Sequence, residues 1–354
     1  MYIYSEVKNM PAERISRKHR AFIVQSMCEG MPVNGICRMT RVSKRAVLRV
    51  LQETGEACED WHDRHFRDLA VERVEIDEQW AYVGKHKENL TEAEKQTRPD
   101  LGDCWLWASI DPDSKAILNW RTGKRTLEAA YALVNDLASR IPTGEIQVTT
   151  DALANYEFAL RGAFPGRLHH ATETKDFRKV DPGAPFTRRV DPLLGVKRKA
   201  VTGTPDLGEA TPSHIERFFL TVRQSDKRTS RKTLAYSKLW MNHAFAASIH
   251  CFVYNMVRTH STIKTTPAVA LGLVPKRWTL ENVVEMTEAY LKAKEEAAFE
   301  EAFKSKFVSK PKAPRRTYTP VKPKTPWYLD PESGGPRPDP MDRKPGIAYE
   351  DDIN

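Results

Sequence analysis

The chain begins with apolar residues spaced like those of short helices. Between residues 17 and 55 the apolar positions form three runs of helical period, separated by Gly30 and by the turn "TRVS". Ser43, at the end of this turn, is a favourable N-cap for the third helix. That helix turns apolar residues inward and leaves three basic side chains outside: Lys44, Arg45 and Arg49. The pattern predicts a helix-turn-helix domain whose third helix enters the major groove of DNA. A small helical bundle with a solvated basic face is the alternative.

The pattern of the middle of the chain changes from helical to alternating. "VERVEIDEQWAYVG" alternates apolar and polar residues as a strand does. The elements predicted in order are strands 71–83, 103–111 and 116–123, helix 126–141, strand 145–151 and helix 152–164. This order predicts an antiparallel meander, followed by a parallel strand after a helical crossover. It is the order of a ribonuclease H-like core. The predicted fold class is therefore α/β: a mixed sheet with flanking helices, preceded by an all-α helix-turn-helix domain.

The remaining segments complete a domain plan. Its parts are a helix-turn-helix domain at 1–56, a linker at 57–71, a catalytic core at 72–275 with an insertion near 172–210, a helical extension at 276–307 and a tail at 308–354. The tail is rich in proline and lysine, so it cannot support a packed core and is predicted to be disordered.

Composition narrows the class of partner. The 354 residues carry a net charge of +9, which favours a polyanionic partner, with nucleic acid ahead of an anionic membrane surface. No apolar run approaches the roughly 20 residues of a membrane span, and the N-terminus lacks the apolar centre of a signal peptide. The five cysteines form no CxxC pair, as expected of reduced thiols. The sequence predicts a cytoplasmic, nucleoid-associated protein with no membrane partner.

Three acidic residues occupy positions typical of a catalytic site. Asp77 lies in the first predicted strand, Asp151 ends the fourth strand, and Glu216 lies in the first turn of a later helix. A ribonuclease H-like core brings such positions to one point, where the carboxylates repel each other unless cations neutralise them. Hard carboxylate oxygens suit Mg²⁺ or Mn²⁺, and two such ions can serve phosphodiester chemistry. Because the chain has 47 acidic residues, ordinary solvated acids are the alternative.

The local sequence around these acids resembles that of a known family, the DDE transposases of the insertion-sequence-one type. The matching stretches fall within residues 17–237 and are "VEIDEQWAYVGKH", "DCWLWASIDPDSKAILNWRTGKRT", "VTTDALANYEFAL" and "SHIERFFLTVRQSDKRTSRKTLAYSK". In that family a basic residue follows the catalytic glutamate by seven positions on the same helical face. Arg223 occupies that position after Glu216, and Arg217 would contact phosphate. Members are usually shorter, so residues 172–210 and the chain after 306 are extra.

The resemblance implies a DNA transposase with Asp77, Asp151 and Glu216 as catalytic and metal-binding residues. It implies cleavage at the ends of a mobile element and transfer of the 3′ hydroxyls to a target strand. Double-stranded DNA, as terminal inverted repeats and target, would be the partner, and handling two ends implies a homodimer or larger assembly. Two other functions remain open. One is a ribonuclease H-like nuclease or resolvase, and the other is a non-catalytic DNA-binding regulator derived from a transposase.

Other residues have a structural and a functional interpretation. His169, His170 and His214 are either contacts to DNA or structural histidines. The indoles of Trp80, Trp105, Trp107 and Trp120 either fill the core or stack on bases.

Overall fold

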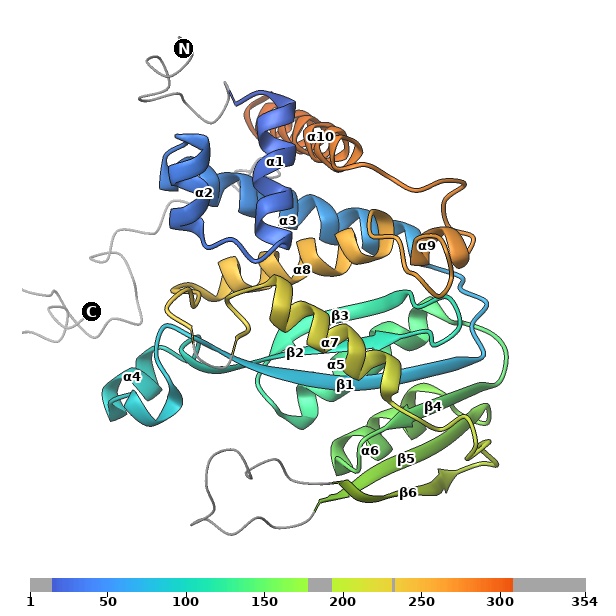
Figure 1. The fold of residues 1–354 in the computed structure, drawn as a ribbon. Helices are drawn as coiled ribbons and strands as arrows, with labels where there is room; N and C mark the ends of the chain where they lie inside the picture. Colours follow the sequence, from blue (N-terminus) through green and yellow to red (C-terminus); the bar gives the residue numbers. More distant parts are fainter. Residues whose placement is uncertain (1–14, 178–192, 231–232, 308–354) are drawn as a thin grey trace, which may run out of the picture. The chain divides into compact units, whose positions relative to one another are not determined.

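The computed structural model describes residues 15–177, 193–230 and 233–307 (Figure 1). The predicted tail at 308–354 and residues 178–192 of the predicted insertion lie outside this range. The chain divides into two compact units, Met1–Ala297 and Ala298–Asn354. The sheet and every helix before α10 belong to the first unit.

One mixed sheet of six strands forms the centre of the first unit. In spatial order the strands are β3 (Ile117–Gly123), β2 (Gly102–Ile110), β1 (Arg73–Val83), β4 (Ile146–Thr150), β5 (Leu168–Phe177) and β6 (Leu193–Thr202). The first three strands pair antiparallel, β4 and β5 add in parallel, and β6 returns antiparallel. The meander and the parallel addition after a helix are those predicted from the sequence, so the predicted fold class is confirmed.

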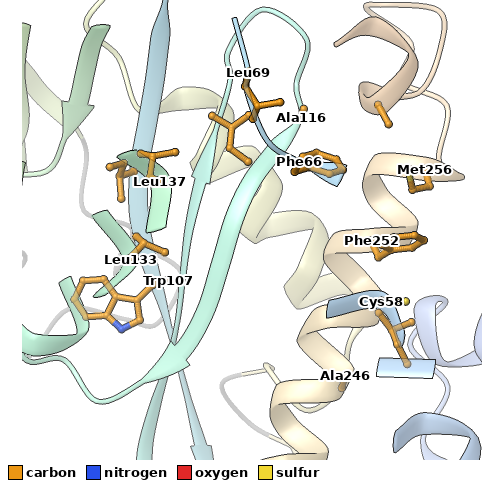
Figure 2. Close-up of a cluster of buried hydrophobic side chains, with 14 of the residues drawn as sticks. Cys58, Phe66, Leu69, Trp107, Ala116, Leu133, Leu137, Ala246, Phe252 and Met256 are labelled. Atoms are coloured by element: carbon orange, nitrogen blue, oxygen red, sulfur yellow. The ribbon is translucent and has the colours of Figure 1, made fainter. Parts of the chain in front are cut away.

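Helices cover both faces of the sheet because successive side chains of a strand point to opposite sides. On β2, Trp107 packs with α5 (Leu127–Arg140) and α6 (Ala154–Ala163) in one core, and Figure 2 shows this indole beside Leu133 and Leu137 of α5. Leu106 and Ala108 point the other way, toward α7 (Ser213–Ser225) and α8 (Trp240–Met256). Trp107 therefore fills the core, which agrees with the structural interpretation and not with base stacking.

The N-terminal helices pack directly onto this layer. They are α1 (Arg17–Cys28), α2 (Val33–Thr40) and α3 (Lys44–His65), and α3 lies along α8 (Figure 1). The third helix was expected to stop near Gly55, with a connector from 57 onward, but it continues to His65. The reason is a narrow buried stripe, Ala57, Cys58 and His62, which the many charged residues around it obscure in the sequence.

A second difference concerns the region expected to form an insertion at 172–210. Strand β5 extends into it as far as Phe177, and β6 lies wholly inside it, paired with β5. These strands are rich in charged residues because β6 is an edge strand whose side chains are mostly exposed. The composition of the segment therefore suggested a loop where the structure has two strands.

The connections add three short elements, and the end of the described chain adds one long helix. They are η2 (Lys87–Asn89), α4 (Glu92–Thr97), α9 (Pro267–Ala270) and α10 (Leu280–Phe307). Among the helices of the described residues, none combines the length and the apolar character needed to cross a lipid bilayer.

The close approach of α3 and α8 depends on the missing side chain of Gly55. A Cβ at Gly55 would lie 2.3 Å from Cβ of Phe245. We expect Gly55→Ala to lower the free energy of unfolding by about 1–3 kcal/mol, because overpacking outweighs the gain of roughly 1 kcal/mol in helix propensity. Urea denaturation measures the change. Gly162→Ala in α6 is the matched control, since its Cβ meets nothing within 4 Å. Equal gains in stability for both variants would contradict the packing argument.

Candidate active site

The register of the central strands places two of the predicted acids side by side. Glu75 of β1 pairs in parallel with Thr149 of β4, so Asp77 and Asp151 come opposite each other two residues later. Asp151 follows the last residue of β4, where the chain leaves the sheet for α6. Carboxylate oxygens of Asp77, Glu78 and Asp151 all lie within 4.8 Å of one another. Strand register thus brings together acids that are 74 residues apart in the sequence.

The backbone at the start of α6 fixes the orientation of Asp151. The amide of Leu153, the N-cap residue of α6, donates a hydrogen bond to Oδ1 of Asp151 at 3.0 Å. The other oxygen, Oδ2, lies 3.6 Å from the guanidinium of Arg125, and 41% of the side chain remains exposed. One oxygen is therefore held by the fold, and the other faces an open cavity.

The third predicted acid, Glu216, is placed by a contact between β1 and α7. Pro212, the N-cap residue of α7, offers no side-chain cap. The buried carboxylate of Glu75 replaces it, accepting hydrogen bonds from the amides of His214 at 2.8 Å and Ile215 at 2.9 Å. A carboxylate at a helix N-terminus satisfies amides that lack partners within the helix and interacts favourably with the helix dipole. Glu216 follows in the same turn.

Alternate residues of β1 contact α7 along its length. Glu75 holds the start of the helix, as described above. With its amide oriented to satisfy both neighbours, Gln79 donates to the carbonyl of Phe219 at 3.3 Å and accepts from Nε of Arg223 at 3.0 Å. Arg223 therefore lies on the side of α7 that faces β1, two helical turns from Glu216. Arg217 is exposed and does not line the acidic cavity.

Asp77, Asp151 and Glu216 line one open cavity of about 520 Å³. Three further charged residues share it: Arg125, Glu173 and Lys175. The ammonium of Lys175 bonds both oxygens of Glu216, with Oε2 at 2.6 Å, and lies 3.9 Å from Glu173. Arg125 forms an ion pair with Glu78 at 2.6 Å and lies 3.6 Å from Asp151. Acids from β1, β5, α7 and the end of β4 therefore meet one cation on β5 and one just after β3.

The electrostatics of Asp77 reflect this crowding. Burial raises its pKa to about 7, and the charge of Glu78 is the next cause. The charges of Asp151 and Glu216 add smaller contributions in the same direction. Burial also raises the pKa of Glu78, opposed by the Tyr156 hydroxyl, which donates to it at 2.6 Å. A divalent cation bound among these carboxylates would offset their mutual repulsion and stabilise their charged forms.

The donor set fits Mg²⁺ or Mn²⁺. Each acid offers hard carboxylate oxygens, which these ions prefer, and the described residues of the cluster include no thiol or imidazole. The residues that could hold one ion are Asp77, Asp151 and Glu78. Glu216 could join a second ion once its pairing with Lys175 is broken.

The histidines considered from the sequence have structural partners. The ring of His170 is buried and bonds Thr150 at 3.0 Å, and Nδ1 of His169 accepts from the amide of Thr204. His214 pairs with Glu75 at 2.6 Å through its ring. Trp80, Trp105 and Trp120 are only half-buried.

Several residues of the site were not identified from the sequence. They are Glu78, Arg125, Tyr156, Glu173 and Lys175. Glu75 and Glu78 looked like ordinary neighbours of Asp77. One signal was available for Glu75, because strand alternation places it on the same face as Asp77. For the cations on β5 and after β3, the sequence offers no such signal.

Comparisons with solved structures return DNA transposase complexes with low similarity. A piggyBac transposase synaptic complex with hairpin DNA aligns over 88% of this chain and 77% of that chain, with 10% identity and a TM-score of 0.36. The Mos1 strand transfer complex aligns over 44% of this chain and 57% of that chain, with 12% identity and a TM-score of 0.18. The Mos1 mariner paired-end complex with Mn aligns over 44% of this chain and 58% of that chain, with 13% identity and a TM-score of 0.18. No family model matches the sequence, and no curated protein matches it. At such scores these likenesses carry no weight for function, which rests on the geometry of the site.

The raised pKa of Asp77 predicts a pH-dependent effect on stability. In the unfolded chain its carboxyl group loses its proton near pH 4, whereas in the folded chain the pKa is about 7. The folded state therefore loses stability as the pH rises from about 4 through 7. We expect Asp77→Asn, which carries no charge, to gain stability over the wild type across this window, by up to about 4 kcal/mol.

Urea denaturation in EDTA at about pH 5 and about pH 8 tests this expectation. Asp68→Asn is the control, because Asp68 is exposed, forms no ion pair among the described residues and has a left-handed backbone that asparagine tolerates. A gain for Asp77→Asn that is the same at both pH values would contradict the raised pKa of Asp77 in the folded chain.

Proposed function

We propose that this chain is a DNA transposase that carries out metal-dependent phosphodiester cleavage and strand transfer. The observation that carries the proposal is the meeting of Asp77, Asp151 and Glu216 in one open cavity. These acids come from a central strand, the end of a parallel strand and a later helix, the arrangement expected of the family that the sequence resembles. The basic balance of the chain agrees with a polyanionic substrate.

Asp77 and Asp151 would hold a first Mg²⁺ or Mn²⁺ ion, and Glu216 would complete the ligands of a second. When bound, such a pair of ions supplies activation of the attacking oxygen and stabilisation of the leaving oxygen. The protein's own cations have a complementary role. Arg125 and Lys175 border the cavity and would bind phosphate oxygens of the substrate, holding the strand in line for displacement.

DNA binding would involve residues outside the cavity as well. Lys44 and Arg45 are exposed at the first turn of α3, and Arg49 is half-exposed on the next turn. These side chains would contact the terminal inverted repeats of the element. Arg217 and Arg223 on α7 would contact the DNA next to the cleaved phosphate. Because two ends have to be held and joined, the active species would be a homodimer or a larger assembly.

A cleavage and strand-transfer assay on labelled DNA in Mg²⁺ tests the function. Asp151→Asn keeps the size of the side chain and its bond to Leu153 but removes the charge. We expect it to bind DNA as the wild type does and to lose both reactions by at least about 100-fold, as for loss of an electrostatic contribution in an active site. Asp68→Asn should remain active.

The same assay separates the alternatives. Cleavage without joining by the wild type would point to a nuclease or resolvase that shares the three acids. DNA binding with neither reaction, on DNA that carries the correct element ends, would favour a non-catalytic regulator. Equal activity of wild type and Asp151→Asn would contradict the assignment of the site.

Lys175 gives an independent test of metal binding. Its ammonium neutralises Glu216 and lies in the cavity where a second cation would bind. We expect Lys175→Met to increase the affinity for Mn²⁺ about tenfold, because one positive charge is removed from beside the carboxylates. Electron paramagnetic resonance titration of free Mn²⁺ measures this without any reaction. Lys197→Met, which removes an exposed lysine paired with Asp176, is the control. An unchanged affinity would place Glu216 outside the metal site.

A further inference from the structure

A second cavity, of about 800 Å³, lies between the N-terminal helices and the segment that follows α7. The start of α2, the first turns of α3, residues 227–228 and residues 233–242 contribute to its walls. Its lining includes no acidic residue of the described chain. It includes four exposed basic side chains: Arg38, Lys44, Lys227 and Lys238. We call this surface the basic groove.

Within the described part of the chain, the exposed charges of the basic groove are not neutralised by acids. None of its four exposed bases forms an ion pair with an acid of the described residues, whereas exposed lysines elsewhere, such as Lys85 and Lys95, do. Arg228 also lines the groove, but its guanidinium is buried and pairs with Asp226. Like charges facing one open space repel each other, and an anionic partner would remove this repulsion.

The basic groove is joined to the active-site strand by direct contacts. The amide of Gly84, just after β1, donates to the carbonyl of Ser237 at 2.8 Å, and Tyr82 donates to Thr233 at 3.1 Å. Val83, the last residue of β1, lies six positions after Asp77 on the same strand. At roughly 3.3 Å per residue this is about 20 Å. A B-form duplex covers that length in about six base pairs.

We infer that the basic groove binds the sugar-phosphate backbone of the same DNA duplex whose scissile phosphate enters the acidic cavity. The contact lies about six base pairs from the cleaved bond. Four exposed cations around one open cavity suit phosphates better than base edges, so the contact sets position and not sequence. This inference rests on the proposed function for the place of the cleaved bond. The binding of duplex DNA by the groove does not depend on catalysis.

The first test is a binding measurement in EDTA, where no reaction occurs. The double variant Lys227→Gln/Lys238→Gln is compared with the wild type on a duplex of about 30 base pairs, by fluorescence anisotropy at several salt concentrations. Each lost phosphate contact reduces the magnitude of the negative slope of log K against log salt by about 0.9, so we expect the two substitutions to reduce it by about 1.8. The control is Lys18→Gln/Lys276→Gln, which removes two exposed lysines outside the groove with no ion pair in the described chain.

The outcomes separate the groove from the proposed function. A salt dependence that becomes shallower for the groove variant and not for the control supports the groove, even if the wild type never cleaves DNA. A slope unchanged by the groove variant, or changed equally by the control, overturns the inference, even if the wild type cleaves and joins. Tighter binding by the groove variant also overturns it, because the groove would then hold something other than DNA.

The second test locates the contact on a cleaved substrate. Ethylation of single phosphates should interfere with wild-type binding at about six base pairs from the cleavage position. The Lys227→Gln/Lys238→Gln variant should lose this interference while keeping the interference next to the cleaved bond. Interference at that distance that persists in the variant would assign the contact to another surface.

Discussion

The register of β1 between β2 and β4 determines where Asp77 and Glu78 lie relative to Asp151. Antiparallel pairing with β2 and parallel pairing with β4 fix the strand on both sides, so its alternate residues have fixed faces. Asp77 then faces α7, and Glu78 faces Tyr156 of α6. A shift by one residue would exchange the two faces and bury the wrong carboxylate. Because β1 is central in the sheet, such a shift would also disrupt both of its neighbours.

The buried carboxylate of Glu75 extends this constraint from the sheet to α7. A charged group inside a protein is costly unless it is fully hydrogen-bonded, and here two helix amides and the ring of His214 surround it. The start of α7 is therefore tied to β1 at a defined residue. Glu216 follows in the first turn, so its distance from Asp77 is set by a polar contact and not by apolar packing alone.

The charges in the cavity are arranged in partial balance. Lys175 and Arg125 offset some of the acids, yet burial and neighbouring charges still raise the pKa of Asp77 to about 7. Protons, divalent cations and phosphates would each change this local balance of charge. The basic groove has the opposite imbalance, with exposed cations and no acid among its described residues. An acidic cavity and a basic groove connected by one strand form a surface suited to a polyanion that needs cations at a single point.

The sequence by itself determined the order of the elements and the three acids of the cavity. Helical period and strand alternation are local properties, so they located β1 to β4 and α5 to α7 within a few residues. The local sequence around Asp77, Asp151 and Glu216 pointed to one site. The tertiary structure decided the rest. The continuation of α3 to His65 depends on a buried stripe against α8, and the strands β5 and β6 depend on pairing with distant neighbours. The roles of Glu75, Arg125 and Lys175 likewise arise from contacts between residues far apart in the chain. Such contacts have no local signature, because the sequence around a charged residue does not show whether its side chain is solvated or paired.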